Sequence, residues 1–261
     1  MKGIILAGGN GTRLHPITKA VSKHLLPIYN KPMIYFPLAS LMLAGIREIL
    51  LITKSEDVPL YQRLLGDGSE FGIQMSYETQ DKPEGIAQAV TIGEKFTDGK
   101  PFTLILGDNI YFGAGFGARL SDAIKNNEGS TVFAYQVANP RAYGVVNMDE
   151  NFKPLEIVEK PADPKSNWAV TGLYVYGADA ATMVKGMKPS PRGELEITDL
   201  NRLYLEQGRM KVEVLGRGFC WLDMGTPQNL LDASDFVRTI EERQGLQVCD
   251  PLEIAANHGW I

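Results

Sequence analysis

The sequence predicts an α/β fold with a mostly parallel central sheet flanked by helices. In the first half of the chain, four short apolar segments alternate with helix-like segments, at residues 3–6, 49–53, 74–77 and 102–106. Strands that are apolar along their whole length are typical of parallel sheets covered on both faces. Ligands of such sheets bind beyond the carboxyl ends of the strands, so the residues that follow these strands are the first candidates for a site.

The remaining elements follow from periodicity and from turn residues. Helices are expected at 32–44, 60–65, 85–96, 119–126, 179–187, 198–207 and 226–243. After about residue 131 the rhythm changes to strands joined by turn-rich links, at 131–137, 144–148, 154–158, 170–176, 211–215 and 218–223. This second set predicts a mixed-sheet extension that carries a second substrate. With no long linker or internal repeat, we expect one domain, residues 1–261.

A glycine-rich loop follows the first strand and has the composition of a phosphate site. Glycines at 8, 9 and 11 let backbone N–H groups approach an anion, and Thr12 and Arg13 add a hydroxyl and a planar cation, with Lys23 close behind. A Walker A loop would need Lys and Ser or Thr after its last glycine, and a dinucleotide fingerprint would need Gly or Ala where Leu14 stands. The simpler interpretation is a surface turn.

Composition narrows the class of protein. The 261 residues are 44% hydrophobic and carry a net charge of −5 with acids and bases interspersed, which disfavours nucleic-acid polymers and membrane surfaces as partners. We see no signal peptide and no membrane-length apolar run. Cys220 and Cys249 have no metal-type spacing and make no disulfide framework, and three scattered histidines do not suggest zinc. These features lead us to expect a soluble cytoplasmic protein.

Four further positions carry candidate chemistry. Asp108 ends an apolar strand at the expected carboxyl edge, where a carboxylate can hold Mg²⁺ against phosphate, and Asp223 ends a second apolar segment. The pair Glu159–Lys160 suits a sugar hydroxyl and a phosphate, and Gln80 can pair with a pyrimidine edge. Each also has a simpler interpretation, namely a turn residue, a structural acid, an exposed ion pair and a solvated amide.

Three other classes of protein compete with the interpretation of these residues as a site for phosphate, Mg²⁺ and a sugar. Residues 113–118 satisfy G-x-G-x-x-A, which would indicate a nicotinamide enzyme, but Asp108 to Phe112 separate the glycines from the preceding strand. Glu194 and Glu196 would share one face of a strand, as a glycosidase pair requires, yet no barrel or repeat surrounds them. A silent sugar-nucleotide sensor would not need both Asp108 and Asp223.

The motifs resemble, in order and over nearly the whole chain, those of the glucose-1-phosphate thymidylyltransferases, a family of sugar nucleotidyltransferases. They read LAGGNGTRLHPIT, SKHLLP, QDKPEGIAQA, LGDNIYFG, ANPRAYGVV, EKPADPKSNWAVTGLYVY, SPRGELEITDLN and GRGFCWLDMGT. The resemblance implies a Rossmann-like nucleotidyltransferase fold with a nucleotide-binding part (1–130), a sugar-phosphate-binding part (131–225) and a C-terminal helical segment (226–261). It also implies Mg²⁺-dependent conversion of dTTP and glucose 1-phosphate into dTDP-glucose and pyrophosphate, at the entry to dTDP-rhamnose and polysaccharide synthesis, commonly by a homotetramer.

The resemblance also implies a role for each matching residue. The catalytic cations are Arg13, Lys23 and Lys160, and the metal ligands are Asp108 and Asp223. The nucleotide site comprises Leu6, Gly8, Gly9, Gly11, Thr12, Arg13, Gln80, Pro83, Gly85 and Asp108. The sugar-phosphate site comprises Gly144, Glu159, Lys160, Val170 and Trp221. No protein nucleophile is needed, because the sugar phosphate itself attacks the α-phosphorus in line.

Two expectations stay open at this stage. Longer family members continue beyond the position of Ile261 with helices that help form a second nucleotide site, so feedback inhibition by dTDP-rhamnose is in doubt for this sequence. A UTP-dependent sugar-1-phosphate uridylyltransferase is the alternative activity, because a methyl group in an apolar pocket contributes only about 1–3 kcal/mol to selection.

The long helix at 226–243 is expected to offer an apolar stripe for oligomerisation.

Overall fold

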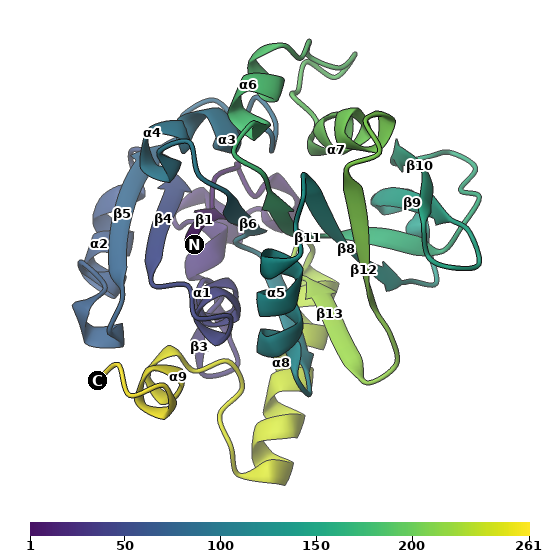
Figure 1. The fold of residues 1–261 in the computed structure, drawn as a ribbon. Coiled ribbons are helices and arrows are strands. Elements are labelled where there is room, and N and C mark those ends of the chain that lie inside the picture. Colours follow the sequence, from purple (N-terminus) through teal and green to yellow (C-terminus); the bar gives the residue numbers. More distant parts are fainter.

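The first half of the chain builds the parallel part of a nine-stranded central sheet (Figure 1). In the computed structural model, which describes residues 1–261, neighbouring strands of this part follow the order β6, β1, β4, β5. Their bounds are β1 Lys2–Leu6, β4 Glu48–Thr53, β5 Gln74–Thr79 and β6 Phe102–Leu106. All three pairings are parallel, as predicted, so the carboxyl ends of the four strands meet at one edge.

The second half extends the same sheet through one long strand, β11. Residues 173–176 of β11 pair antiparallel with β6, and its other edge pairs with β8. The added strands are β8 Ser130–Gln136, β9 Gly144–Met148, β10 Pro154–Glu159, β11 Trp168–Tyr176 and β12 Met210–Leu215. The α/β class with a mixed extension is therefore confirmed, and the extension is continuous with the parallel strands.

Helices cover both faces of this sheet. The alternation of side chains along a strand sends Ile5, Leu51 and Ile105 into one buried cluster, and Ile4 and Leu50 into another. The helices are α1 Tyr35–Leu43, α2 Val58–Leu65, α3 Gln88–Ile92, α4 Glu94–Thr97, α5 Phe116–Lys125, α6 Ala180–Lys185, α7 Ile197–Glu206, α8 Pro227–Gln244 and α9 Pro251–Asn257. The first cluster includes residues of α1, α5 and α9, and the second includes residues of α3, α6 and α7. None of the helices has the length and apolar composition that crossing a membrane requires.

Several predicted boundaries move for local reasons. The helix expected from Pro32 begins at Tyr35, because β3 (Lys31–Pro32) first pairs with β2 (Pro27–Ile28). The helix expected at 85–96 begins at Gln88 and divides at Gly93 into α3 and α4. Single 3₁₀ turns occur at Thr12–Leu14, Ile17–Lys19, Lys23–Leu25, Ser69–Phe71 and Pro140–Ala142.

Besides the β2–β3 hairpin, two elements were not predicted individually from the sequence, β7 (Asn109–Gly113) and α9. β7 forms a separate two-stranded antiparallel sheet with β13 (Phe219–Asp223), in which Asn109 lies opposite Asp223. Neither element conflicts with the sequence. β7 was missed because it follows Asp108 without an intervening helix and so departs from the strand–helix alternation of the first half.

The long helix α8 packs part of its apolar stripe against the rest of the protein. Thr226 caps it, with its Oγ1 accepting from Asn229 N at 3.2 Å, and Pro227 occupies its first turn. Ala233 and Val237 are fully buried in a third cluster together with residues of the β2–β3 region and β7. Leu230, Phe236 and Ile240 are only partly buried, and Leu231 is 62% exposed. The apolar stripe of this helix is therefore covered only in part, and its role in oligomerisation stays a prediction.

A buried ion pair attaches α8 to the N-terminal part of the chain. Glu241 accepts hydrogen bonds from Lys31 Nζ at 2.5 Å, Asn30 Nδ2 at 2.6 Å and Val248 N at 2.8 Å. Both charged side chains are at most 6% exposed. Burial opposes ionisation of Glu241, but the bonds from Lys31 and Val248 outweigh it and lower the pKa of this carboxyl.

We predict that Glu241→Gln lowers the free energy of unfolding at pH 7 by about 3–5 kcal/mol, because Lys31 is left as an unpaired buried charge. The folded-state pKa of Glu241 lies below its ordinary value of 4.5, so the stabilisation by the carboxylate is present above that pH and is lost as the pH falls through the folded pKa. Denaturant unfolding at pH 7 and below pH 4.5 measures both effects. Glu242→Gln is the matched control, because the neighbouring Glu242 makes only an exposed pair with Arg238. Equal losses in the two variants would contradict the prediction.

Candidate active site

The loop after β1 presents free backbone donors at the carboxyl edge of the parallel strands. The N–H groups of residues 8–11 donate to no backbone carbonyl of the chain. Gly11 has φ +56°, in the left-handed region that favours glycine, and Thr18 Oγ1 donates to its carbonyl at 2.7 Å. Successive unpartnered amides along one turn make a binding site for an anion.

Lys23 and Asp108 form a largely buried ion pair beside this loop. Lys23 Nζ lies 2.5 Å from Asp108 Oδ2, and both side chains are less than one-fifth exposed. Burial opposes ionisation of Asp108, but the charge of Lys23 and its hydrogen bond outweigh burial and hold the pKa of this carboxyl well below its usual range. Burial, reinforced by Lys23, lowers the pKa of His24 to about 3, so this imidazole is neutral at physiological pH.

Asn109 fixes the second oxygen of Asp108. Its Nδ2 donates to Asp108 Oδ1 at 2.9 Å, and its own Oδ1 accepts from Trp221 Nε1 at 2.6 Å and from Gly172 N at 3.2 Å. Asn109 is only 2% exposed, so its amide is held from both ends. We did not predict this residue, although it is adjacent to Asp108 in the sequence.

Asp223 reaches the same region from the end of β13. The backbone N–H of the next residue, Met224, donates to the carbonyl of Asp108 at 2.8 Å. Asp223 Oδ1 accepts from Tyr143 Oη at 2.7 Å and from Asn229 Nδ2 at 3.1 Å, whereas Oδ2 accepts no hydrogen bond from the chain. Burial and the bond to Asp223 raise the pKa of Tyr143 above its usual range, so the phenol stays a donor.

The carboxylate oxygens of Asp108 and Asp223 fit a small oxygen-coordinated cation. Both aspartates line one cavity of about 660 Å³, and Asp223 Oδ2 is free to coordinate. No third His, Cys, Asp or Glu side chain joins them in a group that could hold a metal. Mg²⁺ is commonly held by one or two carboxylates together with substrate phosphates and water. The donor set therefore fits Mg²⁺ shared with a phosphate-bearing ligand.

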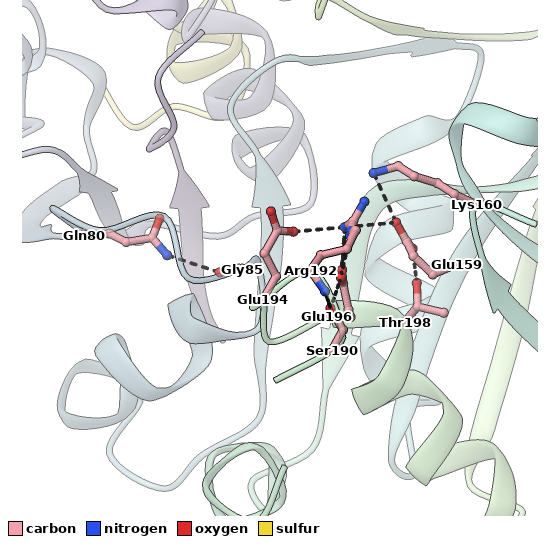
Figure 2. A network of polar contacts seen from close by, with 9 residues as sticks. All are labelled: Gln80, Gly85, Glu159, Lys160, Ser190, Arg192, Glu194, Glu196 and Thr198. Carbon is pink, nitrogen blue, oxygen red and sulfur yellow. Dashed lines mark hydrogen bonds and ion pairs between the residues drawn. The ribbon is translucent and has the colours of Figure 1, made fainter. Parts of the chain in front are cut away.

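The same cavity contains the residues predicted for the sugar phosphate, and Figure 2 shows two of them, Glu159 and Lys160. Glu159, at the end of β10, pairs in register with Gly144 at the start of β9. Thr198 Oγ1 donates to Glu159 Oε2 at 2.6 Å, and Lys160 Nζ lies 3.3 Å from Glu159 Oε1. A Cβ at Gly144 would lie 3.1 Å from Thr198 Oγ1, so a side chain there would crowd this carboxylate.

A second cavity, of about 370 Å³, contains the residues predicted for the base (Figure 2). Gln80 is buried, and its Nε2 donates to Gly85 O at 3.2 Å and to Gln88 Oε1 at 2.6 Å. The simpler interpretation of Gln80 as a solvated amide is therefore wrong. Its Oε1 lies so close to Gly8 that a Cβ there would be 2.7 Å away.

The segment 190–198, a loop that leads into the first turn of α7, links these two cavities. Arg192 Nη2 lies 2.9 Å from Glu194 Oε2 and 3.9 Å from Glu159 Oε1, and its Nε and Nη2 each donate to Glu196 at 3.0 Å. Glu194 and Glu196 therefore share Arg192 rather than one face of a strand, and the segment contains no strand. The alternative of a glycosidase carboxylate pair formed by Glu194 and Glu196 on one face of a strand is therefore wrong. Arg192 was not predicted, because nothing in the sequence places it beside Glu159.

At the other end of this loop, the backbone of Leu195 packs against Gly85. Leu195 N donates to Glu84 O at 2.7 Å, and Ala87 N donates to Leu195 O at 3.1 Å. Gly85 has φ +110°, and a Cβ at this position would collide with the Leu195 carbonyl. Gly85 is therefore required both by its backbone conformation and by the close approach of the loop.

The structure brings nearly all predicted site residues to two adjoining cavities. The larger cavity is lined by Arg13, Asp108, Gly144, Glu159, Lys160, Val170, Trp221 and Asp223. The smaller one is lined by Leu6, Gly8, Gly9, Arg13, Lys23, Gln80, Pro83, Gly85 and Asp108. Arg13 and Asp108 belong to both. Gly11 and Thr12 are in the loop but line neither cavity.

The glycine pattern at 113–118 has a different role from the one its spacing suggests. The argument that no strand precedes it directly is wrong, because β7 ends at Gly113. However, β7 pairs only with β13 and antiparallel, so the parallel strand–helix–strand unit of a dinucleotide site is absent. Gly115, at φ +75°, caps α5, and Phe116 of α5 is buried in the core.

The fold and the site together define a nucleotidyltransferase, and a family model described as nucleotidyl transferase matches residues 2–240. Glucose-1-phosphate thymidylyltransferases from Neisseria meningitidis and Mycobacterium tuberculosis are 57% and 55% identical to the whole chain, which covers 91% and 90% of their lengths. A Bacillus anthracis structure assigned to the same activity and crystallised with a sucrose has a TM-score of 0.85 and 42% identity, over 91% of this chain and 95% of that chain. A UDP-glucose pyrophosphorylase bound to UDP-glucose has a TM-score of 0.81 and 26% identity, over 91% and 98%. The chain belongs to the glucose-1-phosphate thymidylyltransferase family.

We predict that Gly85→Ala destabilises the protein well beyond the cost of a left-handed alanine. That conformational cost is about 1–2 kcal/mol, and the collision with Leu195 adds roughly 1–3 kcal/mol of overpacking. Gly99→Ala is the control, because Gly99 also has positive φ, at +62°, but no atom lies within 4 Å of its Cβ position. Denaturant unfolding of both variants measures the difference. A Gly85→Ala variant no less stable than the control would show that the loop yields without cost.

Proposed function

We propose that the chain transfers a thymidylyl group from dTTP to glucose 1-phosphate, giving dTDP-glucose and pyrophosphate. The observation that carries this proposal is the meeting of two cavities at Arg13 and Asp108. One cavity contains the glycine-rich loop and Gln80, and the other contains Glu159 and Lys160. An enzyme that joins a nucleotide to a sugar phosphate needs this arrangement, because the two phosphates must react at the boundary between their sites.

In the proposed mechanism, the protein binds and orients two anions and supplies no nucleophile. Gln80 and Gly85 hold the thymine, while the free amides of residues 8–11, with Arg13 and Lys23, hold the triphosphate. Lys160 holds the sugar phosphate, whose oxygen attacks the α-phosphorus in line. Catalysis then comes from positioning and from cationic groups that stabilise the charge of the transition state.

The sugar ring is proposed to lie against β9, β10 and β11. Glu159 is fixed by Thr198 and accepts from sugar hydroxyls with its remaining lone pairs, while Gly144 leaves room for the ring and Val170 lines its apolar side. Trp221 contributes one wall of the cavity, since its N–H is already used by Asn109.

We propose Mg²⁺ as the cofactor, held by Asp108 and Asp223 together with phosphate oxygens. When bound there, it supplies positive charge beside the α-phosphate. Asn109, Tyr143 and Asn229 keep the two carboxylates oriented toward the cavity through the hydrogen bonds described above. Lys23 already pairs with Asp108, so this carboxylate would be shared between a fixed ammonium group and the metal ion.

The wider context is proposed from the family. We place the reaction in the cytoplasm, at the first step of dTDP-rhamnose synthesis for cell-surface polysaccharide, and expect a homo-oligomer, most simply a tetramer. The exposed part of the apolar stripe of α8, around Leu231, is proposed to contribute to its interface.

The activity is tested by pyrophosphate release from a panel of nucleoside triphosphates, dTTP and UTP among them, each combined with several sugar 1-phosphates. We expect the highest kcat/KM for dTTP with glucose 1-phosphate. The alternative, a UTP-dependent uridylyltransferase, is favoured only by the more distant UDP-glucose pyrophosphorylase at 26% identity. A higher kcat/KM with UTP than with dTTP would replace the proposal by this alternative.

We predict that Asp223→Asn lowers turnover about 10²–10³-fold, because it removes a metal-binding charge worth roughly 3–4 kcal/mol in the transition state. Asp223 is a cleaner position than Asp108, whose loss would also leave Lys23 without its partner. Turnover is measured across a Mg²⁺ titration, with circular dichroism as the folding check. Asp122→Asn, an exposed position on α5, is the control. Normal turnover and Mg²⁺ dependence in folded Asp223→Asn would leave Asp223 a structural residue.

A further inference from the structure

A third cavity, of about 210 Å³, adjoins the phosphate loop and has a strongly polar lining. It shares Gly9 and Lys23 with the cavity of the base and shares no residue with the sugar-phosphate cavity. Its remaining charged residues come from two other segments, Lys19 after the loop and Lys54 after β4, with Glu56 and Asp57 beside Lys54. The roles described so far use Gly9, Asn10 and Lys23 of this lining, but not Lys19 or Lys54.

We propose that this cavity is the subsite of the leaving pyrophosphate and that Lys54 and Lys19 are its cations outside the glycine-rich loop. The inference rests on the proposed function and adds a pyrophosphate-binding role for residues that no motif singles out. It follows from the order of the cavities, from their charges and from the hydrogen bonds that their polar groups have already made.

The order of the cavities matches an in-line displacement. The sugar-phosphate oxygen forms a bond to the α-phosphorus while the bond from that phosphorus to the bridging oxygen breaks, and the bridging oxygen keeps the electron pair and leaves with pyrophosphate. The attacking and leaving groups therefore lie on opposite sides of the α-phosphate. Shared residues connect the cavities in the series sugar phosphate, nucleotide, polar cavity, which places the leaving group in the third member.

The lining of the cavity carries three lysines, Lys19, Lys23 and Lys54, and two acids, Glu56 and Asp57. Asp108 pairs with Lys23 at 2.5 Å, so Lys23 alone adds little net positive charge. Lys54 is 23% exposed and lies 3.5 Å from Glu56, which is 75% exposed and well hydrated. Asp57 forms no ion pair with either lysine, and a mostly solvated carboxylate such as Glu56 screens a cation weakly, so Lys54 and Lys19 remain available to an anion.

The other polar groups of the cavity divide into used and free donors. Thr18 Oγ1 donates to Gly11 O, and the hydroxyl of Ser22 bonds to that of Tyr61 at 2.9 Å. The N–H groups of Gly9 and Asn10 make no backbone hydrogen bond, and both residues line the cavity. Free amides on one wall and lysines on the other are the donors that a pyrophosphate requires.

The test is calorimetric titration of inorganic pyrophosphate into the Mg²⁺-loaded enzyme, together with the KM for pyrophosphate in the reverse reaction. We expect Lys54→Gln and Lys19→Gln each to weaken both quantities about five- to tenfold, the range of one partly exposed charge-assisted contact. Glu56→Gln should strengthen both, because it removes the acid that competes for Lys54. The KM values for dTDP-glucose and glucose 1-phosphate should stay within about twofold of the wild type, since neither lysine lines their cavities.

Lys125→Gln is the matched control, because Lys125 makes a similar exposed pair with Asp122, at 3.6 Å, on α5. Wild-type pyrophosphate affinity in both lysine variants would overturn the proposal, as would an equal weakening for glucose 1-phosphate, which would indicate only a general loss of positive charge. The calorimetric arm needs no turnover. Pyrophosphate binding that depends on Lys54 in an enzyme making no dTDP-glucose would reject the proposed function while keeping the anion subsite.

Discussion

The ion pair between Lys23 and Asp108 is the contact on which the arrangement of the site depends. Its two residues come from segments that follow adjacent parallel strands, and the pair is mostly removed from water, at 2.5 Å. A buried charge without its partner is costly, so the segment from the glycine loop to Lys23 must return to the end of β6. The parallel pairing of β1 with β6 makes this return possible, because it brings both strand ends to one edge.

Other parts of the site are built outward from Asp108. Asn109 Nδ2 donates to Asp108 Oδ1, the oxygen that does not pair with Lys23. Asn109 Oδ1 accepts from Trp221 and Gly172, which belong to β13 and β11. The backbone carbonyl of Asp108 accepts from Met224, which sets the end of β13 and hence the position of Asp223. A single strand end therefore orients both carboxylates, and the two-stranded β7–β13 sheet acts as the support of the proposed metal site.

Patterns local in sequence were sufficient for the parallel strands and for part of the cavity lining, whereas the family resemblance supplied other lining residues such as Gly144, Val170 and Trp221. Continuous apolar runs correctly predicted the four parallel strands, and the turn after each run correctly located Gly8 and Asp108 at the carboxyl edge. The patterns failed where tertiary contacts override local preference. Pro32 pairs in a small hairpin instead of opening a helix, and β7 pairs with β13 where the strand–helix alternation predicted no strand.

The residues that sequence reasoning missed act mainly by holding other residues. Arg192 and Tyr143 contact carboxylates that lie far away in the chain, Glu159 and Asp223. Asn109 is adjacent to its partner Asp108 but belongs to β7, the strand that was not predicted. Gly85 shows the same limit, since its positive φ is intelligible only beside the backbone of Leu195. Motif spacing can report a residue that touches a ligand, because the ligand imposes a constant geometry on it. A supporting residue is constrained only by its neighbour, so it becomes visible only when the fold shows which residue that neighbour is.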